Sequence, residues 1–156
     1  MALKALRIGA GAGYAGDRIP PAVALAEKGQ LDYLVFECLA ERTIALAQLE
    51  KIQNPMRGFD PLLSARMKAV LPACMAHGTR IITNMGAANP LQAGKEVLAV
   101  AKALGLHQLK VAVVLGDDVL AILQTQYLSE PLMDSTHTVS DIQALLVSAN
   151  AYLGAE

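Results

Sequence analysis

Apolar residues fall into short runs that alternate along this chain with longer segments of helical periodicity. The runs at residues 5–8, 32–36 (DYLVF), 80–83 (RIIT) and 110–115 (KVAVVL) predict four strands. The last run is nearly unbroken, which is typical of a strand covered on both faces.

Prolines, glycines and apolar side chains at three- and four-residue steps predict helices between these runs. The predicted helices cover residues 20–29, 41–53, 61–78, 91–104, 119–126 and 140–152. Strands that alternate with helices favour the α/β class, in which right-handed crossovers join parallel strands. We therefore expect residues 1–156 to form a single α/β domain. Its sheet would be open, mostly parallel and Rossmann-like, with about four to five strands and helices on both faces.

Polar side chains follow every predicted strand, and they are Asp17, Glu37, Asn84, Asn89, Asp117 and Asp118. Ligands of open parallel sheets bind where the carboxyl ends of the strands meet. The sequence therefore predicts a small-molecule site at that edge. Carboxylates and amides can act as general acids or bases or hold a metal. We assign catalytic roles to Asp17, Asn84, Asp117 and Asp118.

The glycine-rich turn GAGAGYAGD, at residues 9–17, contains Gly11, Gly13 and Gly16 at GxGxxG spacing. These glycines and Asn89 are the predicted cofactor-binding positions, although the cofactor itself is left open. Glu37 lies near the position of a ribose-binding acid in a dinucleotide fold. A nicotinamide dinucleotide fingerprint should run straight into a helix, whereas Asp17 and two prolines intervene here. Two alternative interpretations of this turn therefore stand. It is part of the dinucleotide site of an NAD(P)-dependent oxidoreductase, or it is a tight turn that simply requires small residues.

Two further loops each allow two interpretations. The GDD sequence at residues 116–118 could coordinate a divalent cation, or one aspartate could cap the following helix. The NMGAANP loop at residues 84–90 could present N–H groups to an anion or carbonyl, or simply connect a strand to a helix. The three histidines share no spacing typical of metal ligands, so we assign no metal site.

Composition and charge narrow the range of partners. The net charge is -1 and no run of Lys or Arg is present, so nucleic acid is not an expected partner. Cys38 and Cys74 lie in apolar sequence and are expected to be reduced core residues. No apolar segment is long enough to cross a membrane and the start of the chain lacks the pattern of an export signal, so we expect a cytoplasmic protein without a membrane partner.

The chain is unusually apolar, with 54% hydrophobic and 17% charged residues and a mean hydropathy of +0.38. Such a chain is expected to cover part of its surface, either as a homo-oligomer or against a second chain. A third functional hypothesis follows, in which the protein is a non-catalytic assembly module.

Five landmarks occur in order: GAGAGYAGD, LDYLVFECLAERT, TRIITNMGAANP, KVAVVLGDD and SANAYLGA. Together they resemble the amino-terminal part of the acyclic terpene utilisation (AtuA) family over nearly the whole chain. The positions that match the family pattern are Gly13, Gly16, Asp17, Glu41, Thr43, Asn84, Gly86, Asn89, Pro90, Gly116, Asp117, Asp118, Asn150 and Tyr152.

The resemblance implies a role in the catabolism of branched isoprenoid acids and alcohols through CoA thioesters, with an acyl or CoA-type metabolite as the small-molecule partner. It implies part of an enzyme without naming the reaction. In the family the pattern continues beyond NAYLGA. The resemblance therefore implies the amino-terminal part of a longer protein, or one subunit of a split one.

Overall fold

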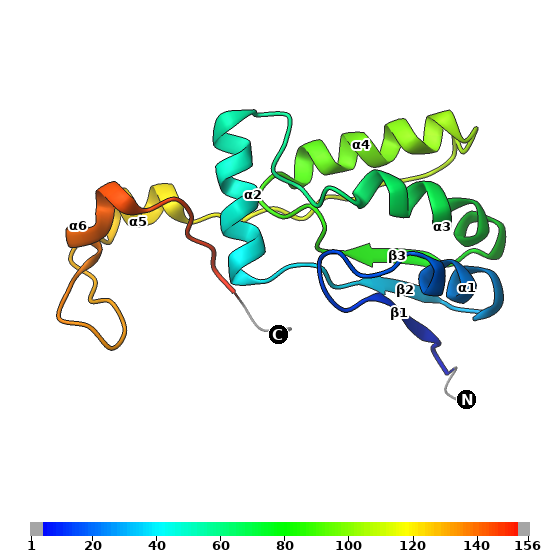
Figure 1. The fold of residues 1–156 in the computed structure, drawn as a ribbon, viewed down its shortest axis with the longest axis horizontal. Helices are drawn as coiled ribbons and strands as arrows, with labels where there is room; N and C mark the ends of the chain where they lie inside the picture. The colour runs from blue at the N-terminus through cyan, green and yellow to red at the C-terminus, as the bar shows by residue number, and fades with distance from the viewer. Residues whose placement is uncertain (1–4, 153–156) are drawn as a thin grey trace. The chain divides into compact units, whose positions relative to one another are not determined.

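Three of the predicted strands form a parallel sheet in the computed structural model, which describes residues 5–152. The strands are β1 (Ile8–Ala12), β2 (Tyr33–Phe36) and β3 (Arg80–Thr83), paired in the order β1-β2-β3 (Figure 1). The first strand begins later than predicted and includes Gly9 and Gly11, so the glycine-rich segment starts inside the sheet rather than after it.

The helices that connect and follow these strands lie close to their predicted positions. They are α1 (Pro20–Lys28), α2 (Glu41–Gln53), α3 (Leu63–His77) and α4 (Pro90–Ala103). Two prolines open α1, and Gly78 ends α3 with a left-handed φ of 70°. Both features are local signals, which is why the sequence pattern identified these helices well.

α1 and α3 cover one face of the sheet. α1 packs on β1 and β2, and α3 packs between α1 and α4 (Figure 1). On the covered face Leu34 and Phe36 are fully buried, whereas Ile8 and Ile82 on the opposite face are 65% and 54% exposed. The prediction of helices on both faces is therefore corrected to one face. Cys38 and Cys74 are both free and buried, which confirms that they are core residues.

The predicted strand at residues 110–115 is wrong, because this segment has no strand structure. Val111 and Val113 lie beside Gly94 of α4, and Val114 is 88% exposed. The apolar run thus packs against a helix instead of a neighbouring strand. The sheet of the described residues has three strands, not the predicted four to five, and gives no support to a Rossmann-like arrangement.

The chain divides into two compact units, Met1–Val113 and Val114–Glu156. The second contains α5 (Leu120–Gln126), α6 (Val139–Ile142) and the 3₁₀ turn η1 (Gln143–Leu145). The long final helix predicted to reach residue 152 is wrong, because the chain becomes extended at Leu146. Between residues 5 and 152, no helix is long and apolar enough to span a membrane.

Candidate functional site

Three loops leave the carboxyl ends of β1, β2 and β3, and Asn84 joins two of them. Its Oδ1 accepts a hydrogen bond from the Cys38 N–H at 2.7 Å, and its Nδ2 donates to Glu37 Oε1 at 3.0 Å. The same Glu37 oxygen accepts the N–H of Leu39 at 3.1 Å. Asn84 therefore holds the loop after β2 in place and orients the Glu37 carboxylate, which is exposed at this edge.

Asp17 closes the turn that follows β1. Its Oδ2 accepts the Gly13 N–H at 3.1 Å, and its Oδ1 accepts the Arg18 N–H at 2.7 Å. These two backbone hydrogen bonds, first the one from Gly13, hold the pKa of the Asp17 carboxyl below its usual value of 3.8. Asp17 is partly exposed, its carboxylate is ionised at neutral pH, and the turn fixes its position.

Arg66 of α3 lies beneath these loops, and the sequence interpretation missed it. Its Nη2 donates to the backbone oxygen of Asp17 at 2.7 Å, and its Nη1 lies 2.6 Å from Cys38 Sγ. A signal for its burial exists, because Arg66 is three residues after Leu63 and four before Val70 on the buried stripe of α3. A charged residue in that stripe indicates a buried polar cluster.

The glycines of the GxGxxG spacing have separate structural roles. A Cβ on Gly11 would lie 2.7 Å from the Phe36 ring, so Gly11 is required for packing. Gly16 has a φ of +89°, whereas Gly13 has open space around it and no left-handed φ. The first two positions of α1 are prolines, which have no N–H group to offer a pyrophosphate. This local geometry argues against a dinucleotide fingerprint.

Asn89 anchors the NMGAANP loop by hydrogen bonds to another loop. Its Nδ2 donates to the backbone oxygens of Pro55 and Arg57, at 2.9 and 2.7 Å. Lys51 Nζ donates to the neighbouring Ala88 oxygen at 2.8 Å. The NMGAANP loop is thus held against the segment between α2 and α3, and the Asn89 amide is engaged in that contact.

Asp117 and Asp118 belong to the second unit, where they meet the last of the five sequence landmarks. Asp117 Oδ2 accepts a hydrogen bond from Asn150 Nδ2 at 3.0 Å, and its backbone oxygen accepts the Ala151 N–H at 2.7 Å. Asp118 Oδ1 accepts the Leu120 N–H at 3.2 Å at the start of α5. The second unit thus brings Asp117 and Asp118 together with Asn150.

The described residues contain neither a reactive thiol nor a preformed metal cluster. Burial raises the pKa of Cys38 more than the nearby Arg66 charge lowers it, and burial likewise raises the pKa of Cys74. Within residues 5–152, no three His, Cys, Asp or Glu side chains are grouped so that they could hold a metal ion.

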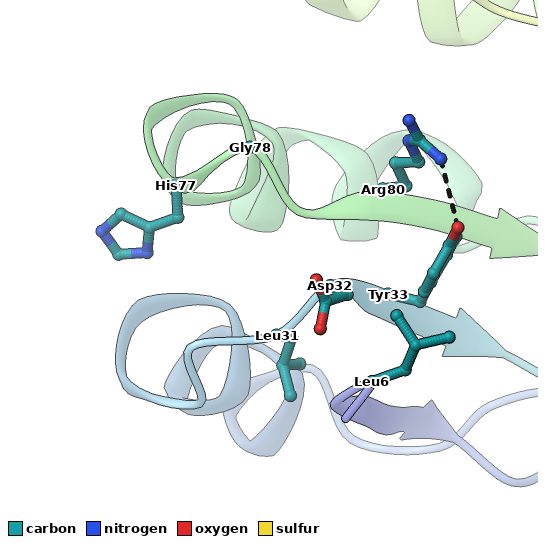
Figure 2. A pocket seen from close by; sticks show the side chains of 7 residues that line it. All are labelled: Leu6, Leu31, Asp32, Tyr33, His77, Gly78 and Arg80. Carbon is teal, nitrogen blue, oxygen red and sulfur yellow. Dashed lines mark hydrogen bonds between the residues drawn. The ribbon is translucent and has the colours of Figure 1, made fainter. Parts of the chain in front are cut away.

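A shallow hollow lies at the opposite, amino-terminal edge of the sheet (Figure 2). Its lining includes Tyr33, His77 and Arg80. Arg80 Nη1 donates to the Tyr33 hydroxyl at 3.1 Å, and the His77 ring is bonded to the Ala26 backbone oxygen through Nδ1 at 3.1 Å. The His77 hydrogen bond thus links the end of α3 to α1.

The fold defines an α/β protein in which Asp17, Glu37 and Asn84 lie on the loops that leave the carboxyl ends of a parallel sheet. A model of the acyclic terpene utilisation family protein AtuA matches residues 6–156. The chain therefore belongs to the AtuA family, as the ordered landmarks predicted. No curated protein and no solved structure matches the chain significantly.

Proposed function

We propose that this AtuA-family chain binds an acyl or CoA-type metabolite of isoprenoid catabolism at the carboxyl edge of its sheet. The observation that carries the proposal is the fixed Asp17 carboxylate, which lies on the turn after β1 and is held by two backbone N–H groups. The exposed Glu37 carboxylate, oriented by Asn84, adds a second acceptor at the same edge of the sheet.

The electrostatics of this edge favour one part of such a ligand. An ionised Asp17 repels the phosphates of CoA, so we propose that the edge receives the acyl portion and its neighbouring polar groups. A carboxyl whose pKa is lowered is a weak general base at neutral pH. Asp17 is therefore better suited to accept a hydrogen bond from a ligand hydroxyl or amide N–H than to remove a proton.

Calorimetric titration of the whole chain tests the proposal. The ligands are a branched isoprenoid acyl-CoA, the corresponding free acid and free CoA, each with and without Mg²⁺. We expect the acyl-CoA to bind and Asp17→Asn to weaken it by about tenfold, as for loss of one charge-assisted hydrogen bond. Glu27→Gln, an exposed carboxylate on α1, is the control and should leave the affinity unchanged. Absence of binding by the acyl-CoA and by the free acid refutes the proposal.

The same protein separates the remaining possibilities. Asp117→Asn and Asp118→Asn, titrated in parallel, test whether the acidic pair of the second unit contributes to binding. An NAD(P)-dependent oxidoreductase instead predicts that a nicotinamide dinucleotide raises the thermal unfolding midpoint and that Gly13→Val removes this protection.

A further inference from the structure

The fully buried guanidinium of Arg66 is the feature of the described residues that most needs an explanation. Its side chain is 1% exposed, and its acidic neighbour Asp60 is 4% exposed. Burying a charged pair costs several kcal/mol per ion unless hydrogen bonds satisfy both groups. An apolar residue at this position of α3 would fill the same stripe without that cost.

The contacts of Arg66 reach four separate segments. Nη2 donates to the Asp17 backbone oxygen after β1, and Nη1 contacts Cys38 Sγ after β2 and Met85 Sδ, at 3.7 Å, after β3. Asp60, in the loop before α3, has its Oδ2 3.9 Å from Nη1. One side chain therefore fixes every loop that leaves the carboxyl edge of the three-stranded sheet.

The cluster is incompletely satisfied, which argues against a role in stability alone. Arg66 Nε and Asp60 Oδ2 are buried and have no hydrogen-bond partner within the described residues. The 3.9 Å between Asp60 Oδ2 and Arg66 Nη1 is also too long for a hydrogen bond. Replacing an imperfect buried ion pair by apolar residues is often neutral or stabilising. Stability therefore gives little reason for an arginine here, whereas the placement of the loops does.

We propose that Arg66 is a positioning residue that sets the geometry of the turn carrying Asp17. Its hydrogen bond fixes the Asp17 carbonyl, while the carboxylate of the same residue is held by Gly13 and Arg18. Binding groups fixed from beneath in this way lose less entropy when a ligand arrives. This inference rests on the proposed function for its consequence in binding, but the ordering of the turn can be measured without a ligand.

The test uses a double variant, because removing Arg66 alone leaves the buried Asp60 carboxylate without a neighbouring positive charge. In Arg66→Met with Asp60→Asn, the charge is removed from both positions, and the new Asn keeps the oxygen that accepts the Leu62 N–H. Arg66→Lys keeps the charge but cannot span Asp17 and Asp60 together. Val70→Ala, a fully buried core position of the same helix, is the control for lost stability.

Hydrogen exchange read by mass spectrometry reports on the turn in the ligand-free protein. We expect the amides of Gly13 and Arg18 to exchange about tenfold faster in the double variant and in Arg66→Lys, while amides of α1 and β2 keep their rates. The unfolding midpoint of each variant is measured beside its exchange, so that the double variant is compared with Val70→Ala at equal stability. Unchanged exchange at the turn, or a change that Val70→Ala reproduces at equal stability, overturns the proposal.

Affinity for the branched acyl-CoA gives the functional readout. Both Arg66 variants should bind about tenfold more weakly, since small misplacement of a positioned group has large effects, whereas Val70→Ala stays near the natural value. Restoration of both affinity and exchange by Arg66→Lys would show that a charge alone suffices and would refute positioning by the guanidinium. If the natural chain binds no acyl-CoA, the proposed function fails, and the exchange experiment still decides the role of Arg66.

Discussion

At the scale of single residues, the glycines show how one spacing can conceal different requirements. Gly11 has no room for a side chain because of the Phe36 ring, which comes 25 positions later in the chain. Gly16 is required instead by its own left-handed backbone angle. The spacing was visible in the sequence, but the packing partner was not, because it comes from another strand.

These separate requirements predict an ordered set of stabilities for alanine variants. Gly11→Ala should cost about 1–3 kcal/mol, because the new methyl overlaps the Phe36 ring. Gly16→Ala should cost about 1–2 kcal/mol, because its φ is left-handed. Gly13→Ala has room for its methyl and should stay within about 0.5 kcal/mol. Urea unfolding of the three variants measures the order, and a Gly13→Ala loss equal to that of Gly11→Ala contradicts the assignment.

Asp17 adds a prediction about pH. Its pKa in the folded chain is lower than in the unfolded chain, mainly through the Gly13 N–H, so it stabilises the fold above the unfolded value of 3.8. That stabilisation is lost as the pH falls through the folded pKa. Asp17→Asn should therefore lose less stability than the natural chain between about pH 5 and pH 2.

Urea midpoints measured across that range for the natural chain, Asp17→Asn and the control Glu27→Gln decide the point. Asp141 of the second unit also has a lowered pKa, through the Thr138 N–H and hydroxyl, so it needs its own Asn variant. An identical pH dependence in Asp17→Asn and the natural chain contradicts the prediction.

At the scale of elements, local signals predicted well and non-local pairing did not. α2 was predicted at the bounds it has, 41–53, because its residues carry the helical pattern themselves. Residues 110–115 have the composition of a strand, but a strand also needs a neighbour, and an apolar run does not specify one. Here Val111 and Val113 of this run lie against Gly94, a small residue on α4.

The contact between this segment and α4 predicts a coupled pair of substitutions. A Cβ on Gly94 would lie 2.8 Å from Val113 Cγ2, so Gly94→Ala alone should be neutral or destabilising despite its better helix propensity. In a Val113→Ala background the clash is gone, and the same change should stabilise the chain by up to about 1 kcal/mol. A double-mutant cycle in urea measures the coupling. Additive effects would mean that the segment does not lie against α4.

At the scale of the whole molecule, the family pattern predicted more than the individual motifs did. The five ordered landmarks identified the AtuA family, which the match over residues 6–156 establishes. They did not reveal that the fourth and fifth landmarks contact each other, because Asp118 and Asn150 are 32 positions apart in the chain. The organising Arg66 was also missed, since it belongs to none of the landmarks.

The second unit provides the last prediction, because it has little buried surface of its own. Val139 is its single buried residue within the described chain, so its order depends on polar contacts such as Asn150 to Asp117. Asn150→Ala removes the side-chain bond and should weaken the bridge that includes the Val119 and Ala151 amides, which donate to Ala149 and Asp117. Both amides should exchange several-fold faster, while amides of β2 and α3 in the first unit keep their rates. The control is Gln143→Ala, which removes a different hydrogen bond of the same unit, to the Gln124 oxygen. If both variants accelerate hydrogen exchange at the two amides equally, the unit opens as a whole and the contact between the landmarks does not stabilise the structure around it.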